Sequence, residues 1–269
     1  MVAQIVLIRG GGDLASGVAL RLFRAGIQVL ITELPEPLAV RRAVSFSQAV
    51  YDGQIQVEGI LARRAQDASD ALSLLAARTI PVLVDPTAAC RRELNPVVIV
   101  DGRMTKQIPD LDRHWANLVI GLGPGFEAGK DCHAVIETRR GPFLGRVIWQ
   151  GAAEADTGLP DPVFHFEGER VLRAPVDGTL VTHALIGDHL QVGQLIAEVD
   201  GTPIKSLFPG VLRGLLRTGM VVRKGLKIGD LDPRDDPQLA NLVSEKSLAI
   251  GGGVLEAILS KPEIRKRLW

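Results

Sequence analysis

The stretch QIVLIRGGGDLASGVALRLFRAGIQVLITE, residues 4–33, is the clearest indication of the fold class. Residues 4–8 form a short apolar run that is typical of a buried strand, and the glycines at 10–12 end it. Leu14, Val18 and Leu22 then recur at helical spacing until Gly26, and residues 28–32 form a second apolar run. A strand, a glycine turn, a helix and a second strand in this order predict a Rossmann-type βαβ unit.

The glycine turn has the spacing of a phosphate-binding loop. Gly10, Gly12 and Ala15 match the pattern G-x-G-x-x-G/A, and Glu33 ends the second strand 21 residues after Gly12. Backbone N–H groups at the start of a helix bind phosphate, and a carboxylate at the end of the next strand accepts hydrogen bonds from ribose hydroxyls. We therefore expect a nucleotide site formed by Gly10, Gly11, Gly12, Asp13, Leu14, Ala15 and Glu33.

Asp13 departs from this pattern. Its carboxylate lies in the first helical turn and competes with a bound phosphate for the positive end of the helix dipole. The alternative interpretation is a glycine turn with a helix capped by Asp13 and no ligand.

The following residues predict a parallel-sheet domain over residues 1–150. Apolar runs predict strands at 54–62, 80–84, 97–100 and 118–120, helices are expected at 38–50 and 67–78, and a terminal hairpin pairs 134–137 with 145–149. Strands that alternate with helices of this length favour βαβ crossovers and a parallel sheet.

Three further groups are candidates for the same sheet edge. Arg41 and Arg42 follow the second strand and either meet an anionic ligand or form a solvated helix start. Gly121, Gly123 and Gly125 form a second glycine-rich loop after a strand, where open α/β sheets bind their ligands. Behind this loop, the neighbouring side chains at 132 (Cys) and 133 (His) should point to opposite faces of an extended segment, so we do not expect them to act on one atom.

The second half of the chain differs in kind. Residues 151–167 are rich in small residues and proline and are expected to be a linker. Within 168–234 an internal repeat with an offset of 32 aligns Gly178, Gly187 and Gly193 with Gly210, Gly219 and Gly225. This repeat is similar to that of the biotinyl/lipoyl carrier domains, which implies a small all-β barrel-sandwich hybrid.

The hairpin tip of such a carrier domain holds the modified lysine. Here Asp200-Gly201 predicts the tip, and Lys205 lies several residues beyond it, so we expect neither biotin nor lipoate. In the C-terminal segment, 235–269, a strand at 247–250, a glycine turn at 251–253 and a helix are expected to pack back on the first domain.

Composition limits the classes of partner. The 269 residues carry 31 basic and 31 acidic side chains, so the basic surface that nucleic acid requires is not expected, and the absence of net charge favours a homo-oligomer. No apolar run is long enough to span a bilayer, which predicts a protein without a membrane segment. Two cysteines and no metal-ligand spacing predict a cytoplasmic chain without disulfides or a metal site.

Several long blocks of sequence resemble one family. GGGDLASGVALRLFRAG, RRAVSFSQAVYDG, VIGLGPGFEAGKDCHAVIETRRG, LGRVIW, KIGDLDPR and EKSLAIGGGVLEAIL are similar to blocks of the YqeB-type proteins of the selenium-dependent molybdenum hydroxylase system. The resemblance covers residues 5–260 and implies a role in the maturation of molybdenum hydroxylases, related to that of the XdhC-type maturation factors. It points to Gly10–Gly17 with Glu33, to Arg41–Arg42 and to Gly121–His133 as functional blocks.

Three functions remain open at this point. The favoured one is an accessory or maturation factor that binds NAD(P) or a dinucleotide form of the molybdenum cofactor at the first glycine loop, with a molybdenum hydroxylase as partner. The second is an NAD(P)-dependent oxidoreductase, for which the single tyrosine, Tyr51, offers no proton-transfer pair. The third is an interaction protein whose repeat domain docks a partner. No catalytic residue is assigned.

Overall fold

The computed structural model describes residues 4–104, 110–155 and 168–268 in two compact units. Unit 1 comprises residues 1–37, 45–156 and 243–269, and unit 2 comprises 38–44 and 157–242. The short segment 38–44 therefore leaves the sheet unit and returns to it. Most of the predicted linker, residues 156–167, lies outside the described residues.

Unit 1 is built on a nine-stranded sheet in the order β10-β9-β7-β6-β1-β2-β5-β4-β3. All neighbouring pairs from β9 to β4 are parallel, and the edge strands β10 and β3 are antiparallel. The α/β class and the mostly parallel sheet are thus confirmed. The strands are β1 (Ile5–Arg9), β2 (Gln28–Glu33), β3 (Gln54–Val57), β4 (Ile60–Ala65), β5 (Ile80–Val84), β6 (Val98–Asp101), β7 (Leu118–Leu122), β9 (Ala134–Ile136) and β10 (Val147–Ile148), and β8 (Glu127–Ala128) pairs separately with β11 (Gly151–Ala152).

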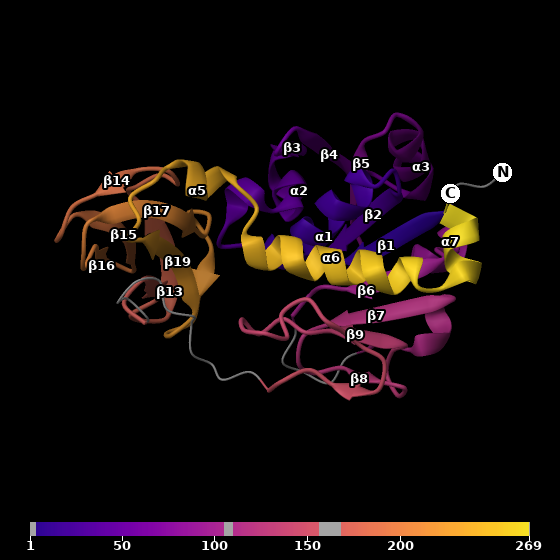
Figure 1. The fold of residues 1–269 in the computed structure, drawn as a ribbon. Helices are drawn as coiled ribbons and strands as arrows, with labels where there is room; N and C mark the ends of the chain where they lie inside the picture. The colour runs from indigo at the N-terminus through magenta and orange to yellow at the C-terminus, as the bar shows by residue number, and fades with distance from the viewer. Residues whose placement is uncertain (1–3, 105–109, 156–167, 269) are drawn as a thin grey trace. The chain divides into compact units, whose positions relative to one another are not determined.

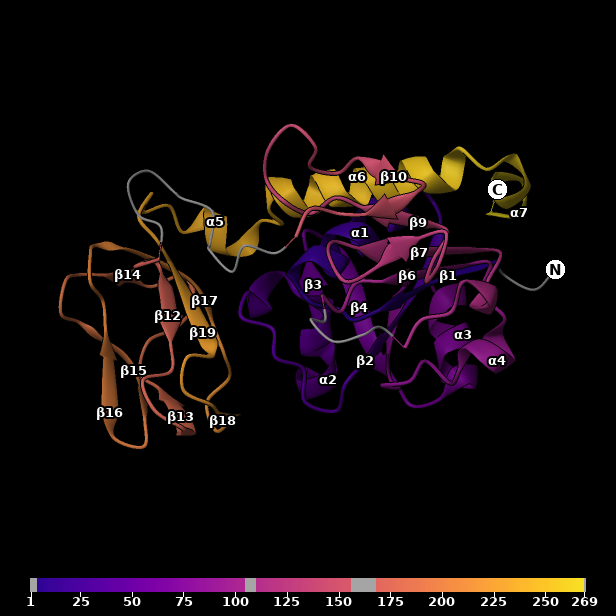
Figure 2. The same cartoon turned by 90° about the horizontal axis from the view of Figure 1, so that it is seen from below.

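Helices cover both faces of this sheet (Figures 1 and 2). Helix α1 (Asp13–Arg24) packs closely on α6 (Glu245–Leu259) over one face, and α3 (Ala68–Ala76) and α4 (Arg91–Leu94) lie over the other. The short α2 (Ala49–Asp52) and α7 (Pro262–Leu268) complete the unit, with 3-10 turns at Phe46–Gln48 and Arg113–Trp115. The central strands are buried on both faces, which explains their continuous apolar sequences.

Unit 2 consists of two four-stranded antiparallel sheets, β12-β19-β17-β14 and β16-β15-β13-β18. Shifting by 32 residues superimposes β12, β13, β14 and β15 on β16, β17, β18 and β19, so each sheet contains the counterparts of the other. The internal repeat is thereby confirmed, whereas the barrel-sandwich-hybrid assignment stays a prediction. The strands are β12 (Val171–Arg173), β13 (Gly178–Thr182), β14 (His189–Leu190), β15 (Leu195–Val199), β16 (Thr202–Lys205), β17 (Gly210–Leu215), β18 (Val221–Val222) and β19 (Lys227–Asp232), with one short helix, α5 (Gln238–Asn241).

The predicted hairpin tip is confirmed. Val199 pairs with Thr202 across the turn, and Asp200 and Gly201 both have positive φ, at 43° and 76°. Lys205 ends β16 and does not lie at the tip.

Three element predictions are wrong. Residues 54–62 are not one strand, because Glu58 and Gly59 adopt positive φ and turn the chain into the β3–β4 hairpin. The helix predicted at 38–50 is wrong except at residues 49–50, which begin α2: 3-10 turns at Arg42–Val44 and Phe46–Gln48 precede it, since the N–H groups of Phe46 and Ser47 donate to α1 and to the glycine loop. The strand and glycine turn predicted at 247–253 lie in the first half of helix α6, because Gly251 and Gly253 allow this helix to approach α1 and the β9–β10 connection closely.

Candidate functional site

The first glycine loop lies where the strand order reverses. Strand β1 pairs with β2 on one side and with β6 on the other, and the loops after β1 and β6 are in direct contact. A Cβ on Gly10 would lie 3.3 Å from the Arg103 backbone, and one on Gly102 would lie 2.8 Å from the Ala15 Cβ. In open α/β sheets this switch point is where ligands bind.

Hydrogen bonds hold the centre of the loop. The Gly11 N–H donates to Glu33 Oε1 at 2.6 Å, and the Gly11 carbonyl accepts from the Ser47 N–H and the Ser16 hydroxyl, both at 2.9 Å. A Cβ on Gly11 would lie 2.8 Å from the Ser47 nitrogen. Glycine is therefore required at position 11 by packing, and this part of the loop is fixed in place.

Gly12 is different, because a Cβ there would meet no atom within 4 Å. It is the N-cap of α1 and offers no side chain to the N–H groups of the first turn, which have no acceptor within the helix. Leu14 is half-buried and Ala15 is fully buried, so these two side chains support the helix start.

The Asp13 carboxylate is held by the start of α6. Asp13 Oδ1 accepts from the Ser247 hydroxyl at 2.9 Å, and Ser247 in turn contacts Ser244, the N-cap of α6. The carboxylate is thereby placed near the positive end of a second helix, which stabilises its charge.

Glu33 lies beside the loop at the end of β2. Its two oxygens accept from the N–H groups of Gly11 and Leu34, at 2.6 and 2.8 Å. Burial raises the pKa of the Glu33 carboxyl, although these two hydrogen bonds act in the opposite direction. Each carboxylate oxygen can accept a second hydrogen bond, so Glu33 keeps the capacity to bind a hydroxyl.

A network of charges that the sequence did not reveal lies at the same switch point. The buried Arg9, at the end of β1, pairs with Asp101 at 3.2 Å and with Asp110 at 3.0 Å. Arg103 binds the same two carboxylates. The Arg9 guanidinium also lies 5.2 Å from the ring centre of Trp115. Arg9 was missed because it continues an apolar strand and carries no motif.

Contacts within the protein hold the other predicted site residues: hydrogen bonds hold the two arginines, and close packing or backbone conformation requires the glycines of the second loop. Arg41 and Arg42 belong to unit 2, where they donate to the backbone carbonyls of Leu239, Leu242 and Leu215. In the second glycine loop, a Cβ on Gly121 would overlap the Phe126 side chain, and one on Gly123 would lie 2.5 Å from Thr138 Oγ1. Gly125 has a φ of 104°, which favours glycine.

The two cysteines are not activated. Cys132 is buried in the core, and burial raises its pKa to about 11. Burial and the neighbouring Asp85 raise the pKa of Cys90 to about 12. Thiols with such pKa values are protonated at neutral pH and are poor nucleophiles. The described residues include no cluster of three or more histidine, cysteine or acidic side chains that could hold a metal ion, and no helix among them has the length and apolarity to cross a bilayer.

The fold and the site define a class: an α/β protein with a glycine loop at the switch point of a parallel sheet, joined to a small antiparallel β unit. Within this class the chain is a homologue of the uncharacterized protein YqeB of Escherichia coli (strain K12), with 46% identity over 256 residues. The match covers 95% of the chain but 47% of the relative, so the chain spans about half the length of that protein. The resemblance to YqeB-type proteins is thus confirmed.

Other comparisons add little. No protein-family model matches the chain. Among solved structures, an aspartoacylase family protein from Mesorhizobium loti MAFF303099 covers 85% of both chains at 14% identity, with a TM-score of 0.26. A TM-score this low carries no inference about fold or function.

Proposed function

We propose that the chain is an accessory factor in the maturation of molybdenum hydroxylases, and that unit 1 holds a nucleotide-containing ligand at Gly10–Gly12. The ligand is NAD(P) or a dinucleotide form of the molybdenum cofactor, because both present a pyrophosphate. The proposal about hydroxylases rests on the resemblance to the YqeB-type proteins, and the proposal about the ligand rests on the site.

One observation carries the ligand proposal. The N-terminus of α1 lies at the switch point, has no side-chain cap, and faces open space at Gly12. N–H groups at such a helix start bind phosphate oxygens, and a glycine allows the phosphate to approach the backbone. Glu33 lies next to the loop, in the position from which a carboxylate binds ribose hydroxyls.

A valine at position 12 tests this proposal without disturbing the core. The φ of Gly12 is −70°, which any residue adopts, and the new side chain enters open space. We expect Gly12→Val to weaken binding at least about tenfold, because the side chain occupies the place of the phosphate. Isothermal titration with NAD⁺, NADP⁺ and molybdopterin cytosine dinucleotide measures the effect and distinguishes the ligands.

Gly252→Val is the matched control. Gly252 lies in α6, and a Cβ there also meets no atom within 4 Å. This variant should bind as tightly as the wild type. No binding of any of the three ligands by the wild type, or equal binding by Gly12→Val, would refute the ligand proposal.

A further inference from the structure

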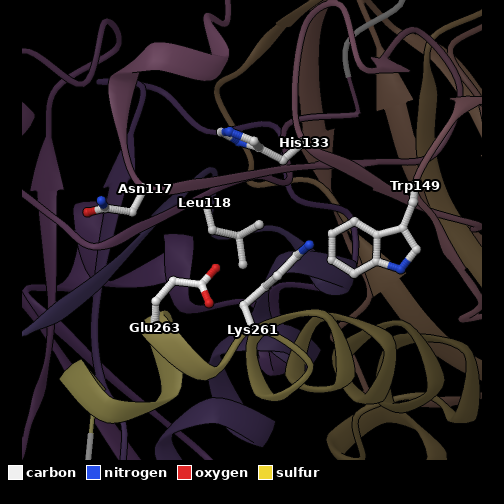
Figure 3. Close-up of a pocket in the computed structure, with 6 residues that line it drawn as sticks. All are labelled: Asn117, Leu118, His133, Trp149, Lys261 and Glu263. Carbon is white, nitrogen blue, oxygen red and sulfur yellow. The ribbon is translucent and has the colours of Figure 1, made fainter.

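A second candidate site lies in unit 1, at the ends of the strands that face away from the glycine loop. A hollow of about 330 Å³ is lined by Asn117, Leu118, His133, Trp149, Lys261 and Glu263 (Figure 3). Leu118 begins β7 and His133 precedes β9, so the hollow lies at the amino ends of these parallel strands. The glycine loop follows the carboxyl end of β1, and the two sites are therefore distinct.

The His133 ring is fixed in one tautomer. Its Nδ1 accepts from the Val119 N–H at 3.0 Å, which leaves the proton of the neutral ring on Nε2. Burial, followed by the charges of Arg113, His114 and Lys261, lowers the pKa of this imidazole. His133 is thus a neutral hydrogen-bond donor in a positively charged environment.

Two opposite charges reach the hollow, Lys261 from the connection between α6 and α7 and Glu263 from the first turn of α7. Figure 3 shows the Lys261 side chain extending toward Trp149 and the Glu263 carboxylate turned toward Leu118. The Lys261 ammonium lies 4.2 Å from the ring centre of Trp149, which holds it in place. Among the residues that the structure describes, Lys261 and Glu263 do not form an ion pair with each other.

The rest of the lining consists of the Asn117 amide, whose oxygen accepts from Arg267 at 2.6 Å, and of two apolar side chains. Leu118 is buried beneath the hollow, and 37% of the Trp149 surface is exposed. An ammonium, a carboxylate, a neutral N–H donor, an amide and two apolar side chains therefore line one cavity. Its volume is at the lower end of the range for sites that bind small molecules.

We propose that this hollow binds a small zwitterion of the α-amino acid class. The ligand carboxylate binds the Lys261 ammonium and the Nε2–H of His133, and the ligand ammonium binds the Glu263 carboxylate. The ligand side chain packs on Leu118 and the Trp149 indole. A ligand with only a negative charge leaves Glu263 opposed to it, and a ligand with only a positive charge is repelled by Lys261 and Arg113, so a zwitterion fits best.

Nuclear magnetic resonance of the full chain, labelled with ¹⁵N in the histidine rings, tests the proposal. The common L-amino acids are added one at a time at millimolar concentration, and the His133 ring signals, assigned with His133→Gln, report binding. We expect a saturable shift for at least one amino acid. Its analogues without the amino group or without the carboxyl group should bind at least about tenfold more weakly.

Two variants and two matched controls locate the effect. Lys261→Met and Glu263→Gln should each weaken binding at least about tenfold, whereas Lys266→Met and Glu256→Gln, at exposed positions on α7 and α6, should not change it. The proposal is overturned if no amino acid shifts the His133 signals. It is also overturned if the carboxylic acid analogue binds as tightly as the amino acid, or if Lys261→Met and Glu263→Gln bind like the wild type.

Discussion

Two adjacent glycines of α6 should respond in opposite ways to alanine. A Cβ at position 252 meets open space, whereas a Cβ at position 253 would overlap the carbonyl oxygen of Gly145 and lie 3.0 Å from Ile136 Cγ2. The main obstacle at position 253 is backbone, so it cannot turn away as a flexible side chain would. The two substitutions are chemically identical and differ only in what surrounds the new methyl group.

The expected magnitudes follow from this difference. Alanine in place of glycine inside a helix stabilises it by about 1 kcal/mol, which is the whole effect expected for Gly252→Ala. Gly253→Ala gains the same amount but also incurs an overpacking cost of about 1–3 kcal/mol, at the upper end because the contact is with backbone. We therefore expect the free energies of unfolding of the two variants to differ by about 1–3 kcal/mol.

Tryptophan fluorescence during urea unfolding measures this difference in free energy specifically for unit 1. Trp115 and Trp149 lie in unit 1, and the residues of unit 2 include no tryptophan, so the signal follows the unit that contains α6. Each kcal/mol corresponds to a shift of roughly 2–4 °C in a parallel thermal experiment. If Gly253→Ala proves as stable as Gly252→Ala, the inference that α6 packs closely on the β9–β10 connection is contradicted.

Two further predictions concern charges near the glycine loop. Asp13→Asn removes a negative charge from the first turn of α1 and keeps an oxygen that accepts from Ser247. The variant should therefore bind the proposed nucleotide more tightly, by about 0.3–1 kcal/mol in the isothermal titrations. Unchanged or weaker binding would contradict this. Hydrogen bonds from two arginines outweigh partial burial and lower the pKa of Asp110 from 3.8 to about 2, so its contribution to stability is present above pH 4 and is lost as the pH falls toward 2. Asp110→Asn should therefore lose less stability than the wild type over this interval, by less than about 1 kcal/mol because the side chain is exposed, and identical pH profiles would exclude the effect.

Much of unit 1 could be predicted from local sequence. A buried parallel strand is a continuous apolar run, and the runs at residues 4–8, 28–32 and 80–84 each overlap a strand of the central sheet. The glycine loop was also found, because its spacing and the strand and helix that flank it lie within one βαβ unit. In unit 2 the internal sequence repeat, with its offset of 32 residues, corresponds to two equivalent sheets, because each strand of one repeat has its counterpart in the other.

The errors arose where distant residues decide local structure. Three consecutive glycines normally favour a turn, yet Gly251 and Gly253 lie within a helix. A Cβ on Gly251 would lie 2.7 Å from the Gly17 carbonyl oxygen of α1, so these glycines allow two helices and a loop to approach closely. The residues next to these glycines in the sequence do not reveal this close approach, because its partners lie far away along the chain.

The first βαβ unit and the buried strands of the central sheet, the repeat in the second unit and the place of the phosphate-binding pattern could be read from the amino-acid sequence alone, because periodicity and turn chemistry are local. Three other features became visible only in the folded chain: Asp13 is held by Ser247, Arg9 is neutralised by two carboxylates, and His133 and Lys261 line one hollow. These pairs are separated by 92 to 234 residues along the chain. Their proximity follows from packing of the whole core, which brings together side chains whose sequences show no relation to one another.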